Sequence, residues 1–276
     1  MIELPEAAVL ADQLNKKIRG KKIIRVISAK SPHKFAWYNG DPKNYKKLLK
    51  DKIVKRADSI GGMVEIKIDS ANLVFTDGVG LRYQYDDKEL PDKHQLLIEF
   101  DNSTFLTASI QMYGGILCFH DGKCENKYYL IAKDKPSPLS KKFNEKYFNN
   151  IISHIYMQNK SVKYFLATEQ RIPGLGNGVL QDILFEAKIH PKRKIENLTE
   201  LEKRKLFNSI KTVLMEMIEK GGRDTEKDLF GNNGRYITKM SKNAAGKPCP
   251  DCGTIIKKEN YMGGSIYFCG KCQRMK

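Results

Sequence analysis

The chain ends in two Cys-x-x-Cys pairs, and no other feature restricts its fold as strongly. The first pair is Cys249 and Cys252, the second is Cys269 and Cys272, and sixteen residues lie between the pairs. Four thiolates at this spacing are typical of a closed tetrahedral zinc site, in which the metal is structural rather than catalytic. We therefore expect one structural Zn²⁺ per chain, bound by these four cysteines.

The residues between the two pairs predict a β-hairpin, with strands at 254–257 and 265–268 around the turn residues Gly263 and Gly264. The alternative for four such cysteines is a pair of disulfides in a secreted domain. The N-terminus does not resemble a signal peptide, which favours zinc and a reducing compartment. We expect Cys118 and Cys124 to be ordinary thiols, one of them buried.

The net charge indicates an acidic partner. The 276 residues carry 49 Lys and Arg against 32 Asp and Glu, which leaves +17. An excess of this size points to a polyanion, and nucleic acid is the first candidate. The alternative is a solvated lysine-rich surface. No apolar run is long enough to span a bilayer, so the sequence predicts a protein without membrane contact.

The first 125 residues predict a helix followed by a β-domain. Residues 3–19 form an amphipathic pattern, with Pro5 in the first turn and Gly20 at the end. A second helix is expected from about Pro42 to Lys50. Short runs separated by turn residues predict strands at 23–26, 64–68, 73–75, 81–85, 96–100 and 115–119. Such regular short strands suggest a sandwich or a barrel.

The rest of the chain changes character. Residues 126–140 contain Lys135-Pro136-Ser137-Pro138 and predict a linker. Helical patterns follow around Phe148–Ile155, Val162–Leu166 and Gly176–Leu184, and from about Thr199 to Lys220. The polar, Gly-rich segment 223–245 predicts a mobile loop. The expected architecture is α+β, with a β-domain at 1–125, a linker at 126–140, a helical domain at 141–240 and a zinc finger at 241–276.

A glycine-rich turn, Gln170–Asn177, lies between two of the expected helices. Glycines allow a close approach of the backbone to a ligand, and a helix N-terminus offers free N–H groups to an anion. Asn177 adds a side-chain donor for the same phosphate. The alternative is an ordinary helix-turn-helix corner in which glycine serves packing.

Several motifs occur together in one order: Glu-Leu-Pro-Glu at 3–6, the Gln170–Asn177 turn, the stretch Asp182 to Pro191, and the cysteine hairpin that ends in Cys272-Gln273. This order resembles the formamidopyrimidine-DNA glycosylase / endonuclease VIII family of base-excision repair. The resemblance implies an N-terminal helix with a two-sheet β-sandwich, a helix–two-turn–helix domain and a zinc finger. It covers nearly the whole chain.

The resemblance also implies a ligand and a set of contacts. The partner is double-stranded DNA that contains a damaged base or an abasic site, and the damaged nucleotide is flipped out of the stack. Asn177 and the backbone at Gly174, Gly176 and Gly178 hold a phosphate beside the lesion. Met112 and Tyr113 occupy the place of the family's intercalating wedge. The alternative is that Met112 and Tyr113 are core residues at a strand end.

The chain departs from the family at three positions. The family nucleophile is the secondary amine of an N-terminal proline, whereas this chain has Ile2 and is expected to retain Met1. Its terminal amine is then primary and one residue out of place. Two family cations are also absent, because Ser59 and Gly264 stand where the resemblance implies a lysine and an arginine.

Glu3 and Glu6 are retained, and both are candidate catalytic residues; the resemblance implies acid/base work by the first of them. We expect the helix dipole to hold Glu3 ionised, which suits a base that activates water. Three hypotheses follow for the chemistry: a glycosylase that cuts the strand poorly, a bifunctional enzyme with a non-proline amine, or a non-catalytic binder of damaged DNA. A zinc-ribbon regulator or ribosome-associated protein is a fourth. We expect a monomer that acts in the cytoplasm of a bacterial-type cell, at the nucleoid.

Overall fold

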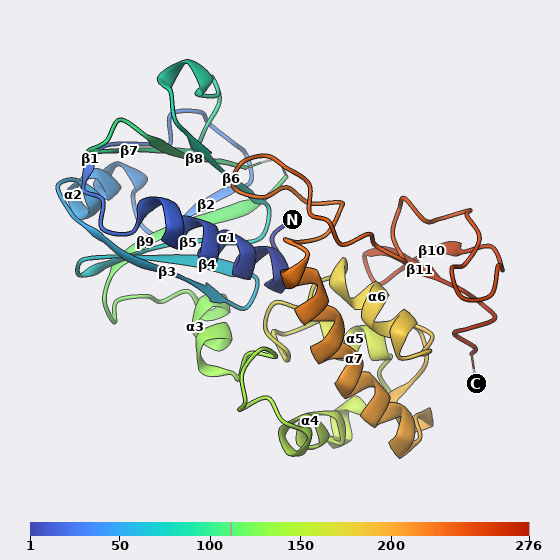
Figure 1. Cartoon of the computed structure of the whole chain (residues 1–276). Coiled ribbons are helices and arrows are strands. Elements are labelled where there is room, and N and C mark those ends of the chain that lie inside the picture. The colour runs from blue at the N-terminus through green and yellow to red at the C-terminus, as the bar shows by residue number, and fades with distance from the viewer. Residues whose placement is uncertain (111, 276) are drawn as a thin grey trace.

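The computed structural model describes residues 1–110 and 112–275, and it places them in two lobes with a small hairpin module beside the second (Figure 1). The first lobe contains helices α1 (Leu4–Ile18) and α2 (Tyr45–Leu49), a short 3-10 turn before α2, and nine strands. These strands are β1 (Ile23–Ser28), β2 (Ala36–Tyr38), β3 (Val54–Ile60), β4 (Met63–Ile68), β5 (Ala71–Phe75), β6 (Val79–Gln84), β7 (Leu96–Phe100), β8 (Phe105–Ile110) and β9 (Gly114–His120). The expected α+β class is confirmed.

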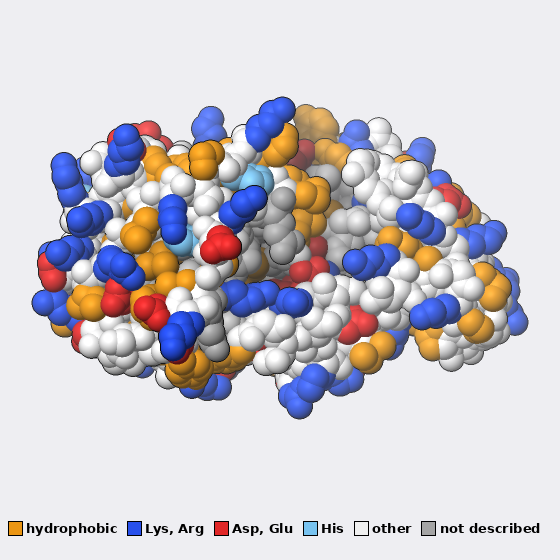
Figure 2. Space-filling view, turned by 90° about the horizontal axis from the view of Figure 1, so that it is seen from above, with side chains coloured by type: hydrophobic (Ala, Val, Ile, Leu, Met, Phe, Trp, Pro, Cys, Tyr) orange, Lys and Arg blue, Asp and Glu red, His pale blue; other side chains and the backbone are white. Residues whose placement is uncertain are grey.

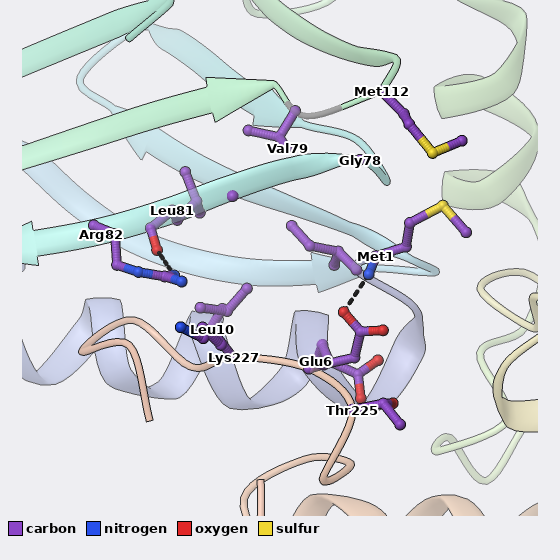
Figure 3. Close-up of a pocket in the computed structure, with 13 residues that line it drawn as sticks. Met1, Glu6, Leu10, Gly78, Val79, Leu81, Arg82, Met112, Thr225 and Lys227 are labelled. Carbon is purple, nitrogen blue, oxygen red and sulfur yellow. Dashed lines mark hydrogen bonds and ion pairs between the residues drawn. The ribbon is translucent and has the colours of Figure 1, made fainter. Parts of the chain in front are cut away.

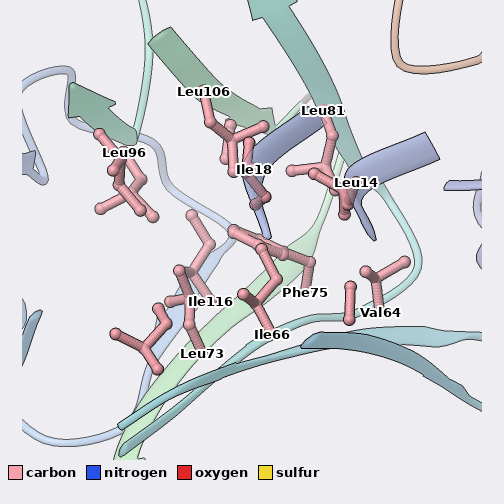
Figure 4. Packing of buried hydrophobic residues seen from close by; sticks show 14 of the residues in the cluster. Leu14, Ile18, Val64, Ile66, Leu73, Phe75, Leu81, Leu96, Leu106 and Ile116 are labelled. Carbon is pink, nitrogen blue, oxygen red and sulfur yellow. The ribbon is translucent and has the colours of Figure 1, made fainter. Parts of the chain in front are cut away.

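The nine strands form two sheets, ordered β1-β7-β8-β6 and β2-β9-β5-β4-β3. Every neighbouring pair is antiparallel except β2 and β9, which run parallel. The inner faces enclose an apolar core to which α1 contributes Leu14 and Ile18 (Figure 4). The predicted sandwich is therefore correct, and α1 closes one side of it.

Three strands were not predicted, and each lacks a simple apolar run. Strand β3 buries only Val54 and Ala57 among seven residues, and β2 has three residues. Strand β8 buries Thr107, whose hydroxyl and the Gln84 amide exchange hydrogen bonds of 3.3 Å. A buried polar residue with a partner costs little, but it breaks the alternation on which a sequence prediction depends.

The second lobe is helical, and its own apolar core includes Phe148, Phe165 and Leu214. Thr199 caps its longest helix through a capping box with Glu202, as its sequence pattern predicts. Within the described residues, no helix is both long and apolar enough to cross a bilayer. The helices from the connector onward are α3 (Lys127–Asp134), α4 (Glu145–Ile152), α5 (Val162–Ala167), α6 (Val179–Glu186) and α7 (Glu200–Glu219).

The segment 126–140, predicted as a linker, contains α3. Asn126 caps this helix by accepting a hydrogen bond from the Tyr129 N–H. Tyr129 and Ala132 pack with Leu117 and Phe119 on the outer face of the five-stranded sheet. The first half of the expected linker is thus a packed helix. Its side chains Tyr129 and Ala132 cover a part of the sheet face that would otherwise be exposed.

The cysteine module is a hairpin of β10 (Lys257–Tyr261) and β11 (Gly264–Phe268). The second strand lies where it was predicted, whereas the first begins three residues after the predicted start at residue 254. Gln181 of α6 docks it, because its side chain accepts a hydrogen bond from the Tyr267 N–H and donates one to the Ser265 carbonyl. The buried Gln273 donates to the Ile189 carbonyl at 2.9 Å. These amide contacts fix the module against the helical lobe.

The two lobes meet where two turns touch. The Gly174 carbonyl accepts a hydrogen bond from the Leu4 N–H at 2.9 Å. Gly174 has φ +82°, and a Cβ at this position would lie 2.5 Å from the Gly61 carbonyl carbon and 2.6 Å from the Gly62 nitrogen. Only glycine fits here, so this contact sets how the helical lobe sits against the start of α1.

Gly174→Ala should lower stability by more than the left-handed backbone alone costs, because the added methyl group meets backbone atoms of Gly61 and Gly62 that cannot rotate away. The backbone cost is about 1–2 kcal/mol. Gly20→Ala is the matched control, because Gly20 has φ +83° with open space around its Cβ position. Urea unfolding of both variants measures the difference, and equal losses would contradict the proposed close contact.

Candidate functional site: a buried carboxylate–guanidinium cluster between the lobes

Glu3 occupies the junction between the two lobes, immediately before α1, and is almost fully buried. Its carboxylate accepts two backbone hydrogen bonds, from the Gly178 N–H at 2.8 Å and from the Val179 N–H at 2.7 Å. These N–H groups open α6, so the charge is stabilised by the N-terminus of a helix in the other lobe. The glycine-rich turn therefore binds a carboxylate of the chain itself.

Arg223 completes the cluster and is 2% exposed. Its Nε and Nη2 bind the two oxygens of Glu6 at 2.9 and 2.6 Å, in the bidentate geometry that suits a guanidinium and a carboxylate. Its Nη1 lies 3.5 Å from Glu3 Oε2. One buried cation thus serves two buried carboxylates from the first turn of the chain.

The balance of burial and charge sets the protonation of Glu3. Burial raises the pKa of the Glu3 carboxyl, and the nearby Glu6 adds to that rise, while Arg223 and the N–H groups of Gly178 and Val179 oppose it. The net direction is upward. The expectation that a helix dipole holds Glu3 strongly ionised is therefore wrong in direction, because the loss of solvent outweighs the helix N-terminus.

Two glycines of the turn make room for this cluster. A Cβ on Gly176 would lie 2.5 Å from Glu3 Oε1, and one on Gly178 would lie 1.7 Å from Arg223 Nη1. Because the Gly178 N–H donates to Glu3, that group is already occupied within the chain. These contacts agree with the alternative that the glycines serve packing. A phosphate contact through their backbone stays a prediction.

The terminal amine lies at the edge of a cavity beside the cluster. Met1 forms an ion pair with Glu226 through its ammonium group. The cavity has a volume of about 260 Å³, and its lining includes Met1, Glu6, Arg82, Met112 and Glu226 (Figure 3). Viewed from above, Lys and Arg side chains border a hollow between the lobes, with acidic atoms inside it (Figure 2).

Met112 and Tyr113 are exposed, at 65% and 40% of their surface. The alternative that placed them in the core is therefore wrong. The Tyr113 hydroxyl lies 3.8 Å from the Met1 sulfur, so this pair of residues stands over the N-terminus. Such exposed apolar side chains at a cavity mouth are free to contact a ligand.

Asn177 lies between the turn and the tip of the cysteine module. Its Nδ2 donates to the Ser265 carbonyl at 2.9 Å, and its Oδ1 accepts from Gln181 Nε2 at 3.4 Å. Gly264 lies directly against it, so a Cβ there would be 3.4 Å from Asn177 Nδ2. Ser59 lies on β3, two residues before the Gly61 turn that meets Gly174.

The four predicted cysteines converge. Their sulfurs all lie within 4.8 Å of one another, with Cys249 and Cys272 at 3.9 Å and Cys252 and Cys269 at 3.4 Å. A tetrahedron with metal–sulfur distances of about 2.3 Å has edges of about 3.8 Å, so this set of donors could hold a metal ion. All six cysteines are described and none is disulfide-bonded, which removes the disulfide alternative.

Sequence reasoning missed Arg223 and Glu226, the two residues that bind the N-terminal carboxylates and amine. Both lie in the segment predicted as a loop, which has no helix or strand but is held by paired backbone contacts at Arg223–Tyr236 and Lys227–Asn233. No local pattern marks a loop arginine as buried. The only signal was a pair of carboxylates at the start of α1 for which the sequence provided no cation nearby.

Comparisons with known proteins agree with this fold. The formamidopyrimidine-DNA glycosylase N-terminal domain matches residues 1–122, and the H2TH domain of the same glycosylase matches residues 135–228. A Prochlorococcus marinus formamidopyrimidine-DNA glycosylase is 31% identical over 190 residues, which cover 67% of this chain and 64% of that protein. The Bacillus subtilis formamidopyrimidine-DNA glycosylase is 25% identical over the full length of both chains.

Solved structures extend the likeness to the arrangement of the lobes. The Lactococcus lactis enzyme in complex with abasic-site DNA has a TM-score of 0.83 at 25% identity. A MutM structure in complex with DNA containing carbocyclic 8-oxo-G has a TM-score of 0.84 at 26% identity. Each alignment covers 99% of both chains. The chain belongs to the formamidopyrimidine-DNA glycosylase / endonuclease VIII family.

Proposed function

We propose that this protein is a base-excision-repair glycosylase that hydrolyses the N-glycosidic bond of a damaged base in duplex DNA. The observation that carries the proposal is the buried Glu3–Arg223–Glu6 cluster beside a cavity at the junction of the lobes. Relatives of the same family are solved with lesion-containing DNA. The net charge of +17 provides the attraction to phosphate.

Duplex DNA would lie across the basic hollow between the lobes. Asn177 is proposed as a donor for a phosphate beside the lesion, because its Nδ2 carries a second hydrogen in addition to the one donated to the Ser265 carbonyl. The target nucleotide must leave the stack before its glycosidic bond can be reached. Met112 and Tyr113, exposed at the cavity mouth, would fill the gap left in the duplex.

Glu3 is proposed as the base that activates water for attack on the sugar. A general base works best when its pKa approaches the working pH, and burial moves the pKa of Glu3 upward in that direction. Its two backbone hydrogen bonds fix the orientation of the carboxylate. Arg223 and Glu6 hold the charge balance of the site and act on the sugar only through Glu3.

Strand cleavage is proposed to be weak. An amine forms an imine only through its lone pair, and the Met1 ammonium is bound by Glu226. It must lose both that contact and a proton before it attacks. This observation favours a hydrolytic glycosylase over the bifunctional alternative with a non-proline amine. The retained pair of carboxylates favours an enzyme over a non-catalytic DNA-binding relative.

The four cysteines are proposed to bind one structural Zn²⁺. Cys249 and Cys269 are buried with Phe185 and Ile256, so the donor set is both closed and shielded. A bound zinc would supply rigidity to the hairpin that carries Gly264 and Ser265 toward Asn177. The backbone of Gly264 and Ser265 would then keep a fixed position relative to α6 when DNA binds.

Glu3→Gln should lower base release at least about 100-fold, the range expected for loss of a general base, with binding to lesion DNA retained. Single-turnover release of the base, read after hot alkali, measures the effect. Glu145→Gln on α4 is the control, because this exposed carboxylate pairs only with Arg204 on the helical surface. Undiminished release by Glu3→Gln would mean that Glu3 is only a helix cap.

Arg223→Gln should move the acid limb of base release to higher pH. Arg223 favours the ionised form of Glu3, so its removal raises the Glu3 pKa further and more alkaline conditions are needed to ionise it. Loss of the buried cation should also cost about 3–5 kcal/mol of stability. Arg223→Lys keeps the charge and should give an intermediate profile. If folded Arg223→Gln shows the same acid limb in its pH–rate profile as the wild type, Arg223 does not set the pKa of Glu3.

Cys252→Ser should lose the metal and disorder the hairpin, because a structural zinc site needs all four ligands. Elemental analysis of the purified variant measures zinc per chain. Cys124→Ser is the control, since Cys124 lies outside the cluster. A full zinc content in Cys252→Ser would show that the four-cysteine assignment is incorrect.

A further inference from the structure

The only tryptophan of the chain is exposed on the edge of a sheet. Trp37 is 64% exposed and its neighbour Phe35 is 50% exposed. Trp37 lies in β2, which forms one edge of the five-stranded sheet. Neighbouring large aromatic side chains on a protein surface form an apolar patch, and such patches often mark interaction sites.

The core does not require these two rings. Ala36 and Tyr38 point inward and pack against the sandwich core. Because side chains alternate along a strand, Trp37 lies on the opposite, outer side. Phe35 lies in the turn directly before β2, where its ring is exposed. Neither ring belongs to the sandwich core, so polar residues at both positions would leave the core intact. Their aromatic character is therefore better explained by contact with a partner.

The aromatic pair adjoins the residues proposed to enter the DNA. Strand β2 runs parallel to β9, with Ala36 opposite Gly114 and Trp37 opposite Gly115. The Phe35 carbonyl accepts a hydrogen bond from the Gly114 N–H at 3.1 Å. Gly114 directly follows Tyr113, and paired strands lie about 5 Å apart. The exposed rings therefore extend the surface of Met112 and Tyr113 onto the next strand.

A cation accompanies the rings. Lys34 is exposed, and its Nζ lies 5.4 Å from the centre of the Phe35 ring. In the part of the chain that the structure describes, Lys34 has no carboxylate within ion-pair distance. An unpaired lysine beside exposed aromatic rings is typical of surfaces that bind single-stranded nucleic acid, because bases stack on the rings and phosphates contact the cation.

We propose that Phe35 and Trp37, with Lys34, form a stacking platform for unpaired bases of DNA that adjoins the lesion. The protein would then bind a lesion beside a fork, gap or bubble more tightly than the same lesion in fully paired DNA. This proposal rests on the proposed function for the lesion, but the platform itself needs only a single strand. Its chemistry is base stacking, so it carries no sequence preference.

The test uses Trp37 as its own probe, since no other tryptophan contributes to the signal. Two substrates carry the same lesion, one fully paired and one with a single-stranded extension beside the lesion. The extension should quench the tryptophan fluorescence and tighten binding. Trp37→Ala should weaken binding to the extended substrate by about 5- to 100-fold, the range for loss of one stacked base, and change the paired substrate much less.

Tyr156→Ala is the matched control. Tyr156 is an equally exposed aromatic, at 73%, in the 3-10 turn Ile155–Met157 of the helical lobe. It should leave both affinities unchanged. Equal weakening of both substrates by Trp37→Ala, or the absence of quenching by the extension, would overturn the proposal. A dimer that Trp37→Ala dissociates would overturn it too, in favour of self-association through this face.

The two proposals fail in different ways. Base release from fully paired lesion DNA reports the proposed function, and Trp37→Ala should not change it. Quenching of Trp37 by an undamaged single strand reports the platform alone. A wild-type protein that shows such quenching but releases no base would support the platform and refute the glycosylase.

Discussion

The buried ion cluster of Glu3, Glu6 and Arg223 is the interaction on which the rest of the structure depends. Two carboxylates without a cation would be costly to bury, and a buried guanidinium without carboxylates would be equally so. The cluster joins the first turn of α1, the start of α6 and the segment after α7. Its carboxylates therefore meet their cation and their N–H donors only when the two lobes and the loop are assembled together.

The glycines around the cluster follow from this requirement. Gly176 and Gly178 leave the space that Glu3 and Arg223 occupy, and Gly174 allows the turn to touch Gly61. A motif that is typical of anion binding here binds an anion that belongs to the chain. The helix N-terminus of α6 serves the same physical purpose for a carboxylate that it would serve for a phosphate. Asn177, between these two glycines, points toward the cysteine module instead of toward Glu3.

Local patterns predicted most of the fold. The spacing of the cysteines, the periodicity of α1 and α7, and the apolar runs of the central strands each carry their information within a few residues. The strands β2, β3 and β8 and the helix α3 were missed, because their stability comes from pairing and from a sheet face that distant residues create. The family resemblance drew attention to the carboxylates, to the turn, and to Met112 and Tyr113, whose role as a wedge stays a prediction.

The sequence could not reveal the partners of those residues. Arg223 reaches Glu6 across 217 positions in the chain, and Glu226 reaches the Met1 amine across 225. Contacts at such separation leave no local trace. The direction of the Glu3 pKa depends in turn on burial that only the assembled lobes provide. Ile2 was visible in the sequence, but the contact of the Met1 amine with the loop carboxylate of Glu226 was not.

The central claim is that Glu3 and water release the damaged base while the N-terminal amine stays unreactive. The most direct test is single-turnover cleavage of duplexes with an oxidised purine, an oxidised pyrimidine or an abasic site. Each is read with and without hot alkali and with borohydride to trap an imine. The account predicts breaks on a damaged-base duplex that need alkali, with no trapped adduct. Direct breaks together with a borohydride-trapped protein–DNA adduct would contradict it.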